Sequence, residues 1–338
     1  MNRTLVALAG LLVLQLIVAA GLGYARSGLS GPPKEVPLVA LTDHKVDRIT
    51  IEGPDKAKVV LAQAKGSWQL PELNDFPADQ TRVKTLVDAL GKLDEGLPVA
   101  TTRDAQTRFK VSDANFERRV TLAAAGKPIG TVYFGTAPSM REIHARREGQ
   151  SDVYSVQFAS WQLPAKASDW EDKTLLQVPV HDIDAIDVAG LHIVHAADKS
   201  ATTRAWQATG LAAGESLDQT AAASLAGSLA DLEFDHVITG TPPPDDGLTS
   251  PAVELTVTKR GGASVVYRIG KSKDGKTYTL ASSTRSELFD VPSYAAEPLI
   301  AAASRNKLLG IKPPAVAAKI KPSTVAATIK PSTVATKH

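Results

Sequence analysis

Two histidines that lie close together, His192 and His195, are the first residues whose chemistry suggests a metal site. Imidazole is the commonest metal ligand in proteins. Both histidines fall in a segment that reads as the strand following Val188, and residues three apart in a strand face opposite sides of a sheet. The neighbouring sequence offers no third ligand, so the pair does not predict a metal centre.

Two short motifs resemble nucleotide-binding or catalytic sequences. Gly270-Lys271-Ser272 matches the end of a phosphate-binding loop, but Val265 stands where such a loop has its first glycine. Ser304 and Lys307 have the spacing of a serine–lysine dyad, although the accompanying motifs are missing. We therefore expect no cofactor, and we expect that the protein is not an enzyme.

Acidic residues are paired at two places, and paired carboxylates can carry out acid–base catalysis. Asp245 and Asp246 follow three prolines, and Asp169, Glu171 and Asp172 flank a tryptophan. Short acidic side chains in loops commonly accept hydrogen bonds from nearby backbone N–H groups. We expect these acids to be solvated caps, which leaves a hydrolase with an unrecognised carboxylate site as the third functional hypothesis.

One basic cluster could form an interaction surface. Arg141, His144, Arg146 and Arg147 lie close together after Gly135, in what reads as a surface hairpin. The cluster could dock an anionic partner, and a solvated hairpin without a partner is the alternative interpretation.

The C-terminal segment, 311–338, repeats Ile-Lys-Pro every nine residues and contains five lysines and no acid. Prolines at this spacing oppose helix and sheet, and few large side chains are present, so we expect a disordered tail. Lys321 and Lys330 could serve a basic arm for an anionic envelope polymer, or the repeat could have no role. Because the whole chain is only +2, the rest of the chain is acidic, which excludes nucleic acid as the expected partner.

The elements that would position these residues occur twice. Residues 46–51 and 183–188 both show the period-two pattern of a half-buried strand. A Trp-Gln pair and an Asp-Gln-Thr sequence follow each strand in the same order, and then comes a helical pattern. The apolar residues of the two helices fall at i, i+3, i+4, i+7 and i+10: Val83, Leu86, Val87, Leu90 and Leu93, and Ala222, Leu225, Ala226, Leu229 and Leu232.

The second half of each copy reads as antiparallel strands. Hairpin patterns end at Gly135 and at Gly270, and each copy closes on a Leu-Leu pair. The sequence thus predicts an α+β fold with two tandem, diverged copies of a strand–helix–antiparallel sheet module, at 45–180 and 181–310. A single N-terminal transmembrane helix is expected to precede them.

The N-terminus indicates where the protein acts. Residues 5–24 contain no charge and are long enough to cross a bilayer as a helix. We expect a signal anchor at 1–25 and a Gly/Ser/Pro-rich linker at 26–44, with a cleaved signal peptide as the rival interpretation. Either places the bulk of the chain outside the cytoplasm. The absence of cysteine excludes disulfides, thiolate metal sites and cysteine nucleophiles.

Several of these landmarks resemble the domain of unknown function 4340 (DUF4340) family. They are Gly66-Ser67-Trp68, Phe76-Pro77-Ala78-Asp79, the closing segment 169–176, and Gly247-Leu248-Thr249-Ser250-Pro251. The first copy departs from this last motif, with Phe109-Lys110-Val111-Ser112-Asp113 in its place. The resemblance implies a single-pass, extracytoplasmic protein that accompanies ABC transport systems of the gliding-motility auxiliary type, without established catalytic residues.

The sequence and the resemblance together favour a non-enzymatic accessory or scaffold protein. We expect it at the inner (cytoplasmic) membrane, with the bulk of the chain periplasmic, in contact with membrane proteins such as ABC transporter subunits. A module that binds an envelope glycan or lipid is the alternative.

Overall fold

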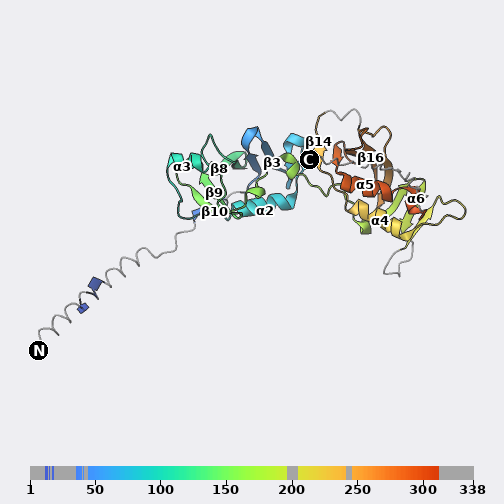
Figure 1. Cartoon of the computed structure of the whole chain (residues 1–338), viewed down its shortest axis with the longest axis horizontal. Coiled ribbons are helices and arrows are strands. Elements are labelled where there is room, and N and C mark those ends of the chain that lie inside the picture. Colours follow the sequence, from blue (N-terminus) through green and yellow to red (C-terminus); the bar gives the residue numbers. More distant parts are fainter. Residues whose placement is uncertain are drawn as a thin grey trace, which may run out of the picture.

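The computed structural model describes residues 36–39, 41, 45–195, 205–240 and 246–311, together with five single residues between 12 and 18. Within these ranges two antiparallel sheets follow one another along the longest axis of the molecule (Figure 1). Short helices lie beside them, and most of the buried apolar side chains form one hydrophobic cluster that extends through both sheets.

The first sheet has eight strands in the described part of the chain, in the order β10-β9-β8-β7-β2-β3-β4-β5. Along the chain these are β2 (Arg48–Glu52), β3 (Lys58–Ala64), β4 (Ser67–Leu70), β5 (Phe76–Pro77), β7 (Arg118–Ala124), β8 (Lys127–Phe134), β9 (Glu142–Arg147) and β10 (Tyr154–Gln157). A separate two-stranded pair joins β1 (Val36–Pro37) to β6 (Asp94–Glu95).

The second sheet also has eight strands among the described residues, ordered β13-β12-β11-β15-β16-β17-β18-β14. They are β11 (Ile183–Val188), β12 (Leu191–His195), β13 (Trp206–Thr209), β14 (His236–Ile238), β15 (Val253–Lys259), β16 (Ser264–Lys271), β17 (Tyr278–Ser282) and β18 (Leu288–Val291). The first sheet from β4 to β10 and the second sheet from β13 to β18 share one arrangement of seven strands. Numbered along the chain, the seven strands are arranged in the order 3-2-1-4-5-6-7 in both sheets. The sheets differ in the added strand, which is β5 beside β4 in the first and β14 beside β18 in the second.

The helices are short. They are α2 (Gln80–Leu90), α3 (Arg103–Arg108), α4 (Gln219–Ala230), α5 (Ser293–Ala302) and α6 (Arg305–Leu308), with 3-10 turns η1 (Pro54–Lys56), η2 (Pro71–Leu73), η3 (Ser160–Gln162), η4 (Ala167–Asp169) and η5 (Val180–Asp182). The side chain of Asp79 caps α2 and that of Asp218 caps α4. Leu86 and Leu225 are buried, as the helical spacing requires.

A glutamine at the first position of α2 and of α4 attaches each of these helices to its sheet. The side-chain amide of Gln80 accepts from Trp68 N at 2.7 Å and donates to Trp68 O at 2.9 Å. Gln219 makes the same two hydrogen bonds with Trp206, both at 2.8 Å. The Trp and Asp-Gln-Thr landmarks of the sequence are therefore two ends of one contact, in which the amide of the glutamine binds the backbone of the tryptophan.

Two glycines at the ends of β8 and β16 allow a loop to cross against the sheet. A Cβ at Gly135 would lie 1.9 Å from Phe109 O, and one at Gly270 would lie 2.2 Å from Asp246 O. The crossing loops have a residue with positive φ at the same point, Lys110 at 54° and Gly247 at 75°. The first copy thus keeps the geometry of the Gly-Leu-x-x-Pro loop with lysine in the left-handed position, where glycine is favoured.

The predicted α+β fold class is wrong. The described chain is mostly β, with two eight-stranded sheets and few helices, and does not have a clear α+β balance. Very short strands such as β5 and β6 were not predicted, because two residues carry no periodicity and pair only through tertiary contacts. The predicted transmembrane segment, 1–25, lies outside the described residues apart from those five single positions. In the described part, no helix has the length and apolarity needed to cross a membrane.

Tyr267 gives the second sheet a predicted sensitivity to alkali. Its hydroxyl is buried and donates to Leu176 O at 2.9 Å, and burial raises the pKa of Tyr267 to about 12. The neutral phenol is thus favoured by folding, so the contribution to stability is complete below pH ~10 and is lost as the pH rises towards 12. The full loss corresponds to about 2–3 kcal/mol.

Urea unfolding followed between neutral pH and pH ~12 checks this prediction, with Tyr267→Phe expected to flatten the fall in unfolding free energy above pH ~10. Tyr294 is 70% exposed and provides the control, since Tyr294→Phe should leave the alkaline slope unchanged. An alkaline slope that is the same in Tyr267→Phe and in the unaltered protein would contradict the assignment.

Candidate functional site

The two sheets meet at a short segment, Trp170–Lys173, which extends the first sheet beyond β5. Asp79 N donates to Trp170 O at 2.8 Å, and Asp172 N donates to Pro77 O at 3.0 Å. Between these bonds Glu171 forms a β-bridge with Ala78. The backbone of the segment therefore occupies the edge that β5 would otherwise leave open.

The side chain of Glu171 reaches the second sheet from this position. Both carboxylate oxygens accept from Val237 N in β14, at 3.2 and 3.3 Å. Lys173 Nζ lies 2.8 Å from Glu171 Oε2 and also donates to Asp235 O. The Glu171 side chain is 2% exposed, so the expectation that this acid is a solvated cap is wrong. This burial could not be predicted from the local sequence, because Val237 lies 66 positions away along the chain.

An aromatic cluster surrounds this ionic contact. The rings of Phe76, Phe234 and Phe289 are buried and lie 4.8–6.2 Å apart between centroids. Lys173 Nζ is 4.7 Å from the centroid of Phe234 and Arg285 is 5.2 Å from that of Phe76. Phe76 belongs to the first sheet and the other two rings to the second half, so the junction is a shared hydrophobic core with a charge pair at its centre.

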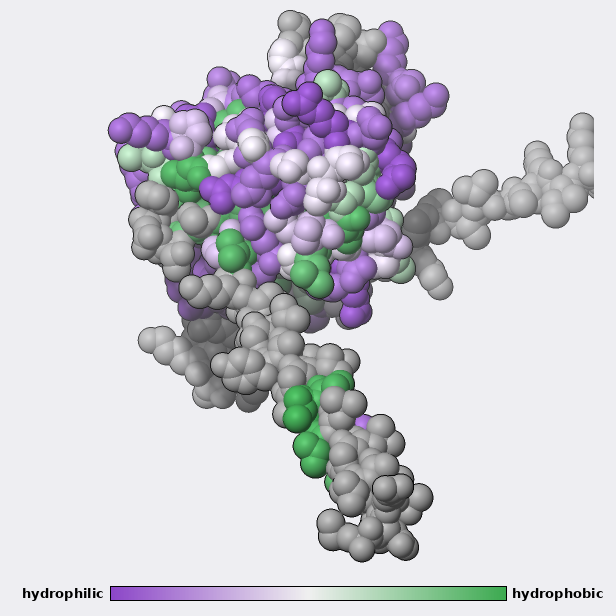
Figure 2. Space-filling view, turned by 90° about the vertical axis from the view of Figure 1, so that its left-hand side faces the viewer, coloured by the Kyte–Doolittle hydropathy of each residue, from purple (hydrophilic) through white to green (hydrophobic). Residues whose placement is uncertain are grey.

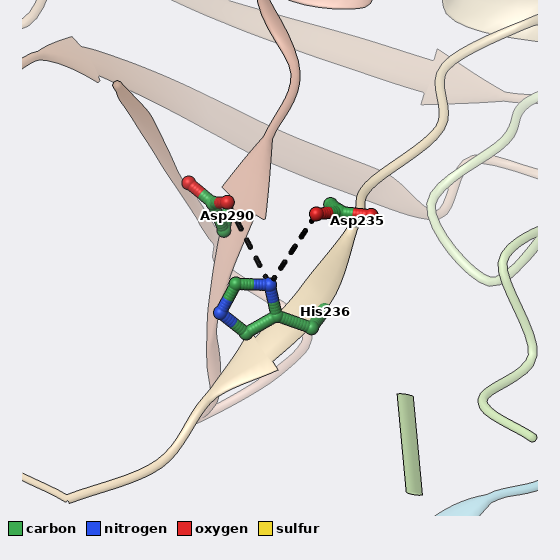
Figure 3. A group of neighbouring side chains, drawn as sticks. All are labelled: Asp235, His236 and Asp290. Atoms are coloured by element: carbon green, nitrogen blue, oxygen red, sulfur yellow. Dashed lines mark ion pairs between the residues drawn. The ribbon is translucent and has the colours of Figure 1, made fainter. Parts of the chain in front are cut away.

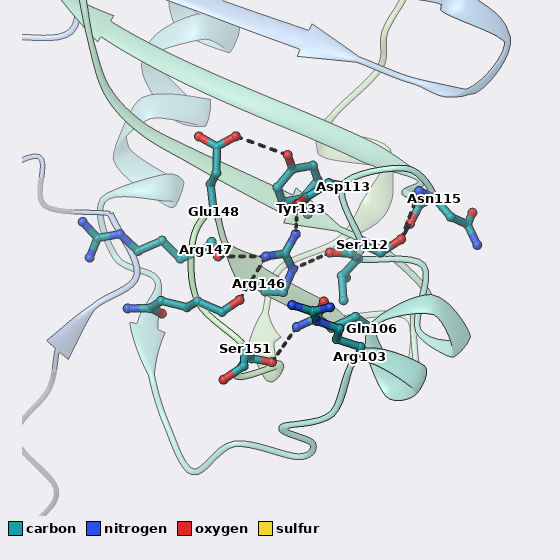
Figure 4. Close-up of polar contacts among 12 residues, drawn as sticks. Arg103, Gln106, Ser112, Asp113, Asn115, Tyr133, Arg146, Arg147, Glu148 and Ser151 are labelled. Carbon is teal, nitrogen blue, oxygen red and sulfur yellow. Dashed lines mark hydrogen bonds and ion pairs between the residues drawn. The ribbon is translucent and has the colours of Figure 1, made fainter.

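Of the six residues predicted for an interaction surface, two are buried structural residues, Arg146 and His144. Figure 4 shows the polar contacts of Arg146. Arg146 is 3% exposed, donates to Val111 O at 2.6 Å and Gln150 O at 3.0 Å, and pairs with Asp113. His144 is 9% exposed and contacts Thr136 O through Nδ1 at 2.8 Å.

Both faces of β9 are covered, which explains why its basic residues do not form a common surface. Arg141 is exposed, Arg147 is half-buried, and Lys321 and Lys330 lie outside the described residues.

Arg141 instead borders a hollow at the far end of the first sheet. Two apolar side chains stand out there, Met140 at 92% and Trp161 at 74% exposure. The hollow has a volume of about 490 Å³, and its lining consists of Met140, Arg141, Gln157, Phe158, Ala159, Trp161 and Gln162. A second hollow of about 370 Å³ shares Gln157, Phe158 and Gln162 and continues to the last turns of α2. We call this continuous surface the Trp161 groove.

The end of the molecule that carries the first sheet has hydrophobic patches that are small and separated by hydrophilic residues (Figure 2). Met140 and Trp161 are the large apolar side chains that the Trp161 groove exposes. Isolated aromatic and methionine side chains beside a polar rim are typical of protein interfaces.

Among the described residues, two aspartates and a histidine form a cluster that sequence analysis missed. Asp235 is the residue before β14, His236 is the first residue of β14, and Asp290 is on β18 (Figure 3). One potential ligand atom from each lies within 4.8 Å of the others. The only available sequence signal was the Asp-His pair at 235–236, and its third member is supplied by strand pairing over 50 residues later.

The motifs discussed first do not assemble into sites. His192 hydrogen-bonds to Asp187 at 2.6 Å, whereas His195 stacks on Trp206. Lys271 lies over the ring of Tyr278, and Ser304 Oγ donates to Ala301 O.

Comparison with known families places the chain. The family described as "Domain of unknown function (DUF4340)" matches residues 68–251, more than half of the sequence. The chain belongs to the DUF4340 family. No curated protein and no solved structure shows significant similarity.

The matched range of this DUF4340 protein begins at Trp68, in β4, and ends just before β15. It therefore contains the joining segment Trp170–Lys173 and β14, whose contacts hold the two sheets together. The range does not include β2, β16 or β18.

Proposed function

We propose that this DUF4340 protein is a non-enzymatic accessory or scaffold protein of the cell envelope, acting outside the cytoplasm beside a membrane-bound transport or assembly complex. The uncharged run at 5–24 supports export of the chain. The family resemblance supports an ABC-type complex as the partner. The body of the protein supplies a surface and a fixed length, and catalysis belongs to the partner.

The observation that carries this proposal is the Trp161 groove. Tryptophan contributes strongly to protein interfaces when a partner buries it, because the ring removes a large apolar area from water. Met140 precedes β9 and Trp161 follows β10, and these strands lie at the opposite end of the first sheet from β5, the strand beside the junction. The buried junction holds this end at a constant distance from the second sheet, which is what a scaffold needs.

Photo-crosslinking in intact cells tests the proposal. A photoreactive phenylalanine derivative replaces Trp161 in one strain and Tyr294 in another; Tyr294 is similarly exposed, at 70%, but lies on α5 outside the groove. We expect adducts with an integral membrane protein of a transport complex from position 161 and none of these from 294. Equal adducts from both positions, or none from 161, would reject the groove as the contact surface.

A glycan is the second candidate occupant of the groove. An exposed tryptophan beside Arg141, Gln157 and Gln162 offers a flat apolar face and several hydrogen-bond donors, the combination that holds a sugar ring. Binding of soluble cell-wall fragments, measured by calorimetry with the unaltered protein and with Trp161→Ala, separates the two. Binding that Trp161→Ala abolishes would favour the glycan over a protein partner.

A further inference from the structure

Three potential metal ligands converge beside the junction, away from the Trp161 groove. His236 Nδ1 lies 3.7 Å from Asp235 Oδ2 and 3.6 Å from Asp290 Oδ2 (Figure 3). At zinc–ligand bonds of about 2.0–2.2 Å, donor atoms around one ion are about 3–4 Å apart. The two spacings from the imidazole are of that size, and all three atoms lie within 4.8 Å of one another, so a cation fits between them after small side-chain rotations.

A second histidine–aspartate pair in the same chain shows what a direct contact looks like. His192 Nδ1 and Asp187 Oδ1 are 2.6 Å apart, within hydrogen-bonding distance. His236 instead faces two carboxylates and is too far from either for a hydrogen bond. The imidazole of His236 also makes this a mixed nitrogen and oxygen donor set, which suits zinc better than oxygen ligands alone.

The positions of the three residues are fixed by backbone contacts. His236 and Asp290 are direct partners in the β14–β18 register, and Asp235 N donates to Asp290 O at 2.7 Å. Asp235 O accepts from Lys173 Nζ, which is itself paired with Glu171. The ligands therefore need little ordering when an ion binds, and ordering is one of the main costs of binding.

The charges around the cluster favour a cation. Among the described residues, neither Asp235 nor Asp290 forms an ion pair with lysine or arginine. A divalent cation would neutralise two neighbouring carboxylates that otherwise repel each other.

We propose that Asp235, His236 and Asp290 form a binding site for a divalent transition-metal ion of the zinc type, with water completing its coordination. The ion would tie β14 to β18 immediately before Val237, the residue whose N–H group is held by Glu171. It would thus stiffen the second sheet at the edge that contacts the first.

Titration calorimetry with zinc chloride near neutral pH tests the site, using the full chain without an affinity tag and after removal of metal by a chelator. We expect one zinc ion per chain in the unaltered protein and loss of that binding in His236→Ala and in Asp290→Asn. His192→Ala removes the other histidine–aspartate pair and should bind zinc normally. The melting temperature of the unaltered protein should rise with added zinc, whereas that of His236→Ala should not.

Asp235 is 72% exposed in its side chain, so Asp235→Asn keeps the test informative if the other variants fold poorly. Weakened zinc binding in that variant would support the site. Absence of zinc binding by the unaltered protein would overturn the proposal, as would a binding isotherm that His236→Ala and Asp235→Asn leave unchanged.

Discussion

Replacing Trp170 by alanine is expected to lower the free energy of unfolding by about 3–5 kcal/mol, the usual cost of removing a large aromatic ring from a packed core. The indole is fully buried and donates to Pro164 O at 3.0 Å. Arg82 lies over the ring at 5.1 Å, which adds a cation–π contact between the segment and α2. The substitution removes all of these contacts and leaves a cavity under the junction.

Trp161→Ala is the matched control, because it removes the same side chain from a 74% exposed position. Surface substitutions usually change stability by less than about 0.5 kcal/mol. Urea unfolding followed by far-ultraviolet circular dichroism measures both variants without relying on tryptophan fluorescence. If Trp170→Ala were no less stable than Trp161→Ala, that result would contradict the packing of Trp170 between α2 and the first sheet.

Removing the carboxylate of Glu171 is expected to cost about 2–4 kcal/mol. Glu171→Ala leaves Val237 N–H buried without an acceptor, and an unsatisfied buried donor costs about 1–3 kcal/mol. The ion pair with Lys173 accounts for the remainder, reduced because the lysine side chain is 32% exposed and can reach water. Glu171→Gln should lose less, since the amide oxygen can still accept from Val237.

The pair between Lys58 and Glu72 supplies the comparison. Its atoms are 3.9 Å apart and both side chains are about half exposed, so Glu72→Ala should change the unfolding free energy by less than about 1 kcal/mol. Equal effects of Glu171→Ala and Glu72→Ala in the same urea titration would rule out a special role for the buried carboxylate.

Local periodicity allowed α2 and α4 to be placed from the sequence. The spacing of Leu86 and Leu225 indicated which side of each helix is buried, and the aspartates before them indicated where the helices begin. The same reasoning failed for β5 and β6, since a two-residue strand exists only through its hydrogen-bonded neighbour. The fold was therefore judged less β-rich than it is.

The functional side chains were harder to predict, because their surroundings come from distant parts of the chain. Arg146 stands in a run of charged residues, yet carbonyl groups at Val111 and Gln150 compensate for its burial. Glu171 has the sequence surroundings of a loop acid, and only the tertiary fold places Val237 N–H beside its carboxylate. Asp290 joins His236 through strand register, which a single sequence does not reveal.

The joining segment also has a consequence for how the protein could be divided. An uncovered sheet edge is a template for pairing with other chains, and Trp170–Lys173 covers the edge of β5 while Glu171 holds the open side of β14. Proteolytic cleavage after Lys173 that released the second half would leave the segment on β5, but it would expose the open side of β14 together with Phe76 and Phe234, so we expect the fragments to aggregate. A protein that consisted of only one half would likewise expose its side of the junction. We therefore expect that both halves must be present in one chain.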